Sequence, residues 1–128
     1  MNDSSPPLGA FSISLAVKDL AASAAFYQKL GFETAGGDPS EHWLMLRNGT
    51  TVIGLFEGMF DKNMLTFNPR WTANAEAAPD DPDIRVLLER FKAAGIEPLL
   101  QHDETGSGPA HFVIEDPDGN QLFFDQHV

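Results

Sequence analysis

The sequence predicts an α+β fold built from two copies of one unit, each a strand, a helix and several further strands. Residues 31–33 read Gly-Phe-Glu, and residues 95–97, 64 positions later, read Gly-Ile-Glu. Each triplet closes a segment whose apolar residues recur at helical spacing. The two stripes lie at the same offset and consist of Leu20, Ala24, Tyr27 and Leu30 and of Ile84, Leu88, Phe91 and Ala94. Such repetition indicates a duplicated unit, with a binding site expected between the copies.

Composition is that of a single water-soluble domain. The 128 residues are 42% hydrophobic, which is enough for a core. A formal net charge of −11 repels phosphate backbones and anionic lipid, so we expect neither nucleic acid nor a membrane as a partner. The chain shows no signal-peptide pattern and no apolar run long enough to span a bilayer, so the expected location is cytoplasmic. The absence of cysteine excludes disulfides and thiolate chemistry.

The first copy begins with a strand over residues 11–17. Large apolar residues alternate there with small ones, which predicts one apolar face and one small, polar face. Asp19 as N-cap and Gly31 after the last turn predict a helix over 20–30. The further elements expected in this copy are strands over 32–35, 43–47 and 51–57 and a turn over 36–39.

The second copy repeats this order. Asp81 as N-cap with Pro82 at the first helical position predicts a helix over 82–94, and Pro98 limits the following strand to a sheet edge. The strands expected in this copy cover 64–68, 96–101, 110–115 and 120–126, the last two joined by a turn at 116–119. The chain is therefore one domain with units over about 9–60 and 61–128.

The pairing of two strands in the first copy follows from their turn. Asn48-Gly49 suits a two-residue hairpin turn. That turn would pair Arg47 with Thr50, Met45 with Val52 and Trp43 with Gly54. Cross-strand partners share a sheet face. The face so predicted carries Trp43, Met45, Arg47, Val52, Gly54 and Phe56.

Two stretches carry a family resemblance. They are Val17-Lys18-Asp19-Leu20 with Ser23 and the run from Phe26 to Phe32, and then Asp116-Pro117-Asp118-Gly119-Asn120. With their spacing, the chain from about residue 9 to its end resembles the vicinal oxygen chelate superfamily, which includes glyoxalase I, extradiol dioxygenases, fosfomycin-resistance enzymes, methylmalonyl-CoA epimerases and bleomycin-binding proteins. The resemblance implies two βαβββ units forming a concave mixed sheet around a cavity, with the helices outside. It does not imply one activity, because that fold carries many chemistries.

Metal-dependent members of that family place four His, Glu or Gln ligands on inward strand positions. In this sequence the resemblance carries those positions onto Ser12, Gly54, about Met64 and Phe123. None is a usual ligand for a divalent metal. The resemblance with this departure implies a metal-free member, so no metal or other cofactor is expected. A glyoxalase-type metalloenzyme that uses His42, Glu57 or His111 is the alternative.

The leading hypothesis is a metal-independent small-molecule binding protein similar to the bleomycin-binding branch, and a homodimer. Its aromatic cavity would lie between the two units. The residues expected to line it are Ser12, Ser14, Trp43, Met45, Arg47, Phe56, Asn68, Trp71 and Phe123. Arg47 either anchors an anion or ends a strand in water. Asn68 and Trp71 belong either to a lid over the ligand or to a packed turn.

Other functions stay open. A metal-free lyase or isomerase would use Asp125 or Glu57 as base, although Asp125 also suits a pair with an arginine at a dimer interface. A purely structural dimer would have a collapsed core and no accessible cavity. The histidines His42, His102, His111 and His127 show no metal-ligand spacing and are interpreted as scattered surface residues.

Overall fold

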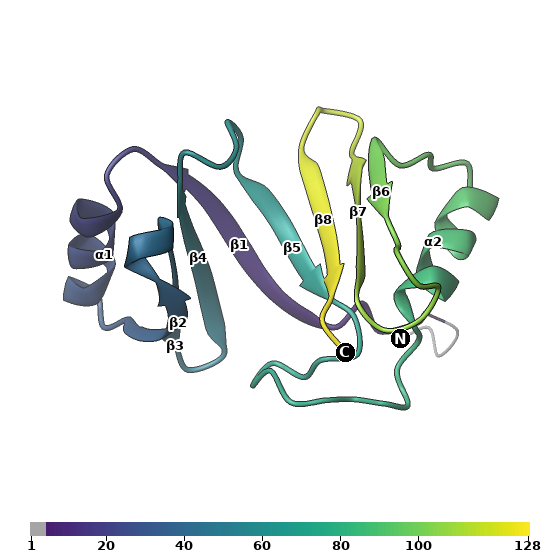
Figure 1. Ribbon diagram of the computed structural model, residues 1–128, viewed down its shortest axis with the longest axis horizontal. Coiled ribbons are helices and arrows are strands. Elements are labelled where there is room, and N and C mark those ends of the chain that lie inside the picture. Colours follow the sequence, from purple (N-terminus) through teal and green to yellow (C-terminus); the bar gives the residue numbers. More distant parts are fainter. Residues whose placement is uncertain (1–4) are drawn as a thin grey trace. The chain divides into compact units, whose positions relative to one another are not determined.

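The computed structural model describes residues 5–128, and its two α-helices and eight strands confirm the predicted α+β class (Figure 1). The chain divides into two compact units. We call Ser12–Leu65 the first unit, and the residues up to Phe11 together with Thr66–Val128 the second unit. Each unit holds one helix, and in each the helix is followed by several strands.

The sheet of the first unit has the strand order β2-β3-β4-β1. These strands are β1 (Ala10–Val17), β2 (Glu33–Asp38), β3 (Trp43–Asn48) and β4 (Thr51–Glu57). β1 runs parallel to β4, whereas β2, β3 and β4 are successively antiparallel. The connection from β1 to β4 contains α1 (Leu20–Lys29), which starts where predicted because the Asp19 carboxylate accepts a hydrogen bond from the Ala22 amide.

The core of the first unit lies between α1 and one face of this sheet. Leu46 and Leu55 are fully buried there beside Leu20 and Ala24 of the predicted helical stripe. Ile13, Leu15 and Val17 of β1 pack against the same cluster, which confirms the predicted alternation there, whereas Phe11 is 49% exposed. The stripe was wrong at Leu30, which is the C-cap of α1 and is 60% exposed.

The β3–β4 hairpin corrects the predicted register. Asn48 pairs with Thr51, so the turn is Gly49-Thr50, and Met45 faces Gly54 rather than Val52. Gly49 has φ +60 and takes the first central position that a type II′ turn reserves for glycine. Asn48 remains in β3 because its side chain donates to the Gly31 carbonyl oxygen at 2.8 Å. The slip is two residues, so the predicted membership of each face is unchanged.

The second unit has the strand order β5-β8-β7-β6. Its elements are β5 (Met64–Asn68), α2 (Ile84–Ala93), β6 (Leu100–His102), β7 (Ala110–Glu115) and β8 (Gln121–Gln126). Ile84, Phe112 and Phe124 form its buried core, and Phe67 stacks on Phe124 with a centroid distance of 5.1 Å. Phe67 therefore belongs to the helix-covered side of this sheet.

Several predicted boundaries were wrong, each for a local reason. α2 begins at Ile84 with Asp83 as N-cap, because the Ile84 amide donates to the buried Gln126 side chain at 2.8 Å and the Arg85 amide donates to Asp83. β6 begins at Leu100 rather than 96, in keeping with the restriction that Pro98 imposes. The segment predicted as a turn over 36–39 instead extends β2 through Asp38, with an irregular register between Thr34 and Gly36.

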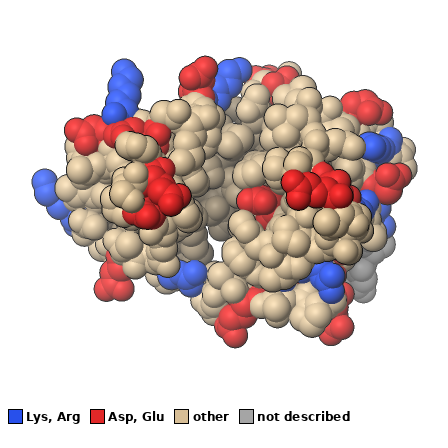
Figure 2. Space-filling view, viewed as in Figure 1, with Lys and Arg blue, Asp and Glu red and all other residues tan. Residues whose placement is uncertain are grey.

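The charged residues give the surface no single basic or acidic patch in the view of Figure 2. Acidic side chains outnumber basic ones there and are spread over the face shown, in line with the net charge of −11. No helix among residues 5–128 is long and apolar enough to cross a membrane.

Replacing Gln126 by alanine should destabilise the second unit, because Gln126 holds the start of α2. Its side chain accepts from the Ile84 amide and donates to Asp83 and to the Gly108 carbonyl oxygen. Buried polar groups that lose a partner cost about 1–3 kcal/mol each, so we expect a loss of about 2–4 kcal/mol in urea unfolding followed by circular dichroism.

Gln121→Ala is the matched control for that variant. Gln121 lies at the other end of β8, opposite Glu115. The loss of unfolding free energy in this variant should be under about 1 kcal/mol. Equal losses in the two variants would contradict the role given to Gln126.

Candidate functional site

In the first unit, the sheet face opposite α1 carries an aromatic surface. The Trp43 and Phe56 rings are cross-strand neighbours, parallel to within 2° with centroids 6.0 Å apart. Phe60 adds a third ring, 5.3 Å from Phe56. On the adjoining strand, Ser12 and Ser14 are each only 4% exposed. We call this surface, made of Ser12, Ser14, Trp43, Met45, Gly54, Phe56 and Phe60, the aromatic face.

Gly54 lies at the centre of this face and has no room for a side chain. It is flanked by Ser14 of β1 and Met45 of β3. A Cβ placed on Gly54 would lie 2.6 Å from Cε2 of Phe56 and 3.0 Å from the Met45 sulfur. The Phe56 ring and the Met45 sulfur thus occupy this space.

These positions do not fit the divalent metal that the family resemblance implies. Position 54 is closed by the Phe56 ring, and Ser12 supplies only a buried hydroxyl. Thioether and phenyl groups, as at Met64 and Phe123, are not ligands for a hard or borderline divalent ion. Within residues 5–128, no group of three or more His, Asp or Glu side chains is arranged to hold a metal ion.

Arg47 is on the predicted face but at its far end. It pairs with Val52 and Glu33 and lines an open cavity of about 320 Å³ at the hairpin turn. It lies four positions along β3 from Trp43, which is about 13 Å along a strand. Arg47 and Trp43 thus lie near opposite ends of β3.

Glu57, one of the two candidate bases, caps a helix. Its Oε2 accepts from the Leu20 amide at 2.9 Å, and its Oε1 lies 3.1 Å from Nδ1 of His42. It follows Leu55 and Ile53 on the α1 side of β4, not on the aromatic face. Both carboxylate oxygens thus have partners, one at the start of α1 and the other on His42.

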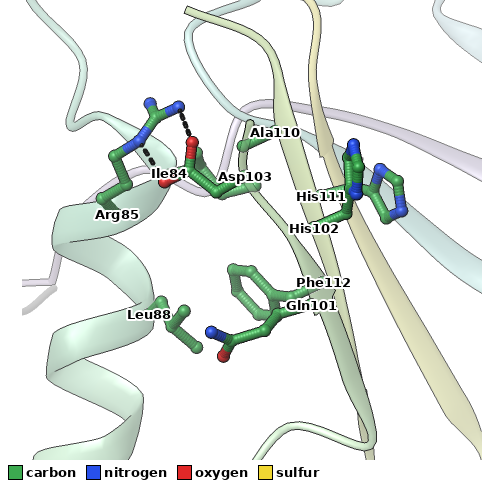
Figure 3. A pocket seen from close by; sticks show the side chains of 9 residues that line it. All are labelled: Ile84, Arg85, Leu88, Gln101, His102, Asp103, Ala110, His111 and Phe112. Atoms are coloured by element: carbon green, nitrogen blue, oxygen red, sulfur yellow. Dashed lines mark hydrogen bonds and ion pairs between the residues drawn. The ribbon is translucent and has the colours of Figure 1, made fainter. Parts of the chain in front are cut away.

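In the second unit, strand register brings together residues that looked scattered. His102 pairs with His111 across β6 and β7, and His111 pairs with Asp125 across β7 and β8. The His102 and His111 rings are stacked with centroids 5.2 Å apart, and Figure 3 shows them side by side. His127 follows two residues after Asp125, with its Nε2 3.2 Å from the carboxylate. We call His102, His111, Asp125 and His127 the histidine row.

The histidine row lines a cavity of about 300 Å³, together with Glu104, Thr105 and Pro109. Trp71, a predicted lid residue, stacks on His127 with centroids 4.4 Å apart and an interplanar angle of 15°. Phe123 contacts His111 edge-on at 5.6 Å. The Asn68 side chain donates to the Asp125 carbonyl oxygen at 2.9 Å. Of the predicted site residues, Asn68, Trp71, Phe123 and Asp125 therefore meet around this row.

The carboxylate of Asp125 controls the protonation of His127. Its hydrogen bond and its negative charge favour the imidazolium form, and partial burial opposes them. The net effect raises the pKa of His127 above its ordinary value of 6.5. The imidazolium form of His127 is therefore favoured near neutral pH.

A smaller cavity beside α2 is structural. It measures about 50 Å³, room for at most a few water molecules, and lies between Leu88, Phe112 and the β6 strand (Figure 3). At its rim, Arg85 donates to both carboxylate oxygens of Asp103, at 2.8 and 2.9 Å. These bonds lower the pKa of Asp103 and tie the loop after β6 to the start of α2. We assign no ligand to this cavity.

The sequence signal for the histidine row was present but incomplete. His111 and Asp125 occupy equivalent positions in the two predicted hairpin strands, so their pairing could have been derived from the turn at 116–119. The contribution of His102 depends on the register of β6, whose predicted range 96–101 began four residues too early and ended before His102. The stacking of Trp71 on His127 has no sequence signal, because a long irregular loop separates β5 from α2.

Comparison with known proteins gives a family and a fold. A family model described as Glyoxalase/Bleomycin resistance protein/Dioxygenase superfamily matches residues 9–124. No curated protein matches the sequence significantly.

Among solved structures, a glyoxalase/bleomycin resistance protein/dioxygenase superfamily member from Vibrio splendidus 12B01 is 20% identical (TM-score 0.63; 91% of this chain and 97% of that one). Methylmalonyl-CoA epimerase from Mycobacterium tuberculosis is 14% identical (TM-score 0.68; 100% and 93%). An extradiol ring-cleaving dioxygenase from B. fuscum is 19% identical (TM-score 0.61; 96% and 34%). At these identities the likeness concerns the fold alone.

Adding a methyl group at Gly54 should destabilise the first unit unless Phe56 is removed. Overpacking of this kind costs about 1–3 kcal/mol, so we expect Gly54→Ala to lose that much in urea unfolding. In Gly54→Ala/Phe56→Ala the clash disappears, and the combined loss should fall short of the sum of the single losses by at least about 1 kcal/mol.

Gly36→Ala provides the control for this cycle, because an added Cβ there meets only the Met45 Cβ, at 3.9 Å. It should change stability by less than about 1 kcal/mol. If the losses of stability in Gly54→Ala and Phe56→Ala were strictly additive, the predicted clash between position 54 and the Phe56 ring would be refuted.

Replacing Asp125 by asparagine should lower the pKa of His127 toward 6.5, because the charge that favours the imidazolium is removed. A raised folded-state pKa stabilises the fold fully below the unfolded value and loses this effect as pH rises through the folded value. The wild type should therefore lose stability between pH 6 and pH 9 by more than the variant does.

The measurements are the NMR titration of the His127 Cε1 proton and urea unfolding at the two pH values. Glu115→Gln, at the other end of the β7–β8 hairpin, should leave the titration unchanged. An unshifted His127 titration in Asp125→Asn would show that the pair has no such effect.

Proposed function

We propose that this chain, which belongs to the Glyoxalase/Bleomycin resistance protein/Dioxygenase superfamily, is a metal-independent member that binds a small amphipathic molecule. One observation carries the proposal. The Phe56 ring lies where a side chain at position 54 would begin, so this strand position holds an aromatic surface and no ligand group. We also propose that the protein acts as a homodimer.

The aromatic face has the chemistry to bind such a molecule. Trp43, Phe56 and Phe60 offer neighbouring ring surfaces, which favour flat apolar groups through burial and stacking. The hydroxyl groups of Ser12 and Ser14, buried on the adjoining strand, supply polar atoms on the same face. A few polar groups within an apolar lining is the usual composition of a small-molecule site.

Arg47 sets a length requirement for any anionic group on the ligand. Since it stands about 13 Å from Trp43 along the strand, one molecule would have to be extended to reach both. A compact ligand would contact the rings without the guanidinium. The structure thus favours an apolar ring system as the part of the ligand that is recognised first.

A second candidate function is a metal-free lyase or isomerase. Such an enzyme needs a base beside its substrate. Both oxygens of Glu57 are engaged, by the Leu20 amide and by His42, whereas Asp125 lines the cavity of about 300 Å³ beside the His127 imidazole. Of the two bases suggested by the sequence, the contacts therefore favour Asp125. Turnover retained in Asp125→Asn would rule this assignment out.

Ligand binding at the aromatic face is testable by fluorescence. With Trp71 replaced by Phe, Trp43 becomes the only tryptophan, because the chain has two. We expect saturable energy transfer from Trp43 to N-phenyl-1-naphthylamine, an uncharged amphipathic probe, and no change on adding EDTA. Loss of one stacking ring in Phe60→Ala should weaken binding about 5–10-fold.

Phe26→Ala is the matched control, because Phe26 is an exposed phenylalanine on α1 and lies outside the aromatic face. It should bind the probe as tightly as its parent. Transfer that fails to saturate, or that weakens equally in both variants, would argue against this site.

Native mass spectrometry of the untagged protein tests the other parts of the proposal, metal independence and dimer formation. We expect a metal-free dimer. One divalent metal per subunit, or a monomer, would contradict it.

A further inference from the structure

We propose that His127, oriented by Asp125, is a general base that removes a proton from a small, planar, uncharged substrate with an acidic C–H bond. The reaction would take place in the cavity lined by the histidine row. All the residues involved belong to the second unit, so the inference does not depend on ligand binding at the aromatic face.

The Asp125–His127 contact selects the reactive atom. Nε2 of His127 lies 3.2 Å from Oδ2 of Asp125. A neutral imidazole carries one proton, and a carboxylate partner at Nε2 favours the tautomer with the proton on that nitrogen. The lone pair then resides on Nδ1, which becomes the proton acceptor. When Nδ1 takes up a proton, the Asp125 carboxylate stabilises the imidazolium that forms.

The imidazole is held on one ring face by Trp71 and through the chain by Gln126. Trp71 stacks on the ring at a centroid distance of 4.4 Å. Trp71 is itself fixed, since its amide donates to the Asn68 carbonyl oxygen and it forms a β-bridge with Ala77. The preceding residue, Gln126, is 1% exposed and bonded to Asp83 and the Gly108 carbonyl oxygen. A base fixed in this way loses little conformational freedom when a substrate binds.

The cavity indicates the class of substrate. Its volume of about 300 Å³ is at the small end of ligand sites, suited to one or two fused rings. The His102 and His111 rings both line the cavity, and aromatic rings in a lining favour a planar molecule. Asp125 and Glu104 both line the cavity and would repel an anion. The cavity therefore suits a planar molecule that is neutral when it binds and becomes negative only as its proton leaves.

The probe for this activity is 5-nitrobenzisoxazole, whose ring opening needs only a base. Nδ1 takes the proton from C3, the C–H electron pair forms the nitrile, and the N–O bond breaks. The products are 2-cyano-4-nitrophenolate and imidazolium, and the imidazolium returns its proton to water. No oxidant, reductant or co-reactant is consumed. The nitrophenolate is followed by its absorbance.

The wild-type protein should open the probe faster than free imidazole at equal concentration, and His127→Gln should lower kcat/KM about 100-fold. The rate should rise with pH as His127 loses its proton, with a midpoint equal to that of its NMR titration. In Asp125→Asn this midpoint should move to lower pH, a shift that a purely structural role for Asp125 would not produce.

Glu115→Gln controls for the loss of a carboxylate in the same hairpin and should leave rate and midpoint unchanged. Imidazole added to His127→Gly should restore part of the rate, whether or not the variant is less stable. A wild-type rate no greater than that of free imidazole, or a rate midpoint that does not follow the His127 titration, would overturn the proposal.

Discussion

The alternation of side chains along a strand is the constraint on which both units depend. Successive residues point to opposite faces of a sheet, and in each unit one face packs against the unit's helix. In the first unit that face takes Leu44, Leu46, Ile53 and Leu55, and in the second it takes Phe112, Ile114 and Phe124. The residues that alternate with them face away from the helix, and both candidate sites take residues from this second set, such as Phe56, His111 and Asp125.

The aromatic face shows how one small residue determines the chemistry of its neighbours. Gly54 lacks a side chain, and the Phe56 ring and the Met45 sulfur take up the space. Trp43 stacks on Phe56 in turn, so the surface is continuous. A ligand side chain introduced at this position would first have to displace the ring. At position 54, where metal-dependent members of the family carry a ligand, packed side chains therefore fill the space that a ligand would need.

The histidine row depends on the register in which its strands pair. His102, His111 and Asp125 come from three strands and are adjacent only because β6, β7 and β8 pair as they do. A slip of one residue in any of these strands would bring different residues together. Trp71 then comes from the loop after β5 to stack on His127. A carboxylate, an imidazole and an indole are thereby assembled beside one cavity.

The sequence by itself determined the elements and the faces of the sheet, because helical spacing, caps and two-residue alternation are local properties. It predicted α1 with its Asp19 cap and the hairpin face that carries Trp43, Met45, Gly54 and Phe56, and the membership of that face survived a wrong hairpin register because the slip was even. It did not predict Phe60, which lies in the loop after β4. It could not place the start of α2, which depends on Gln126, forty-two residues later. Nor could it bring the histidines together. These features rest on contacts between distant segments, which only the packed tertiary structure decides.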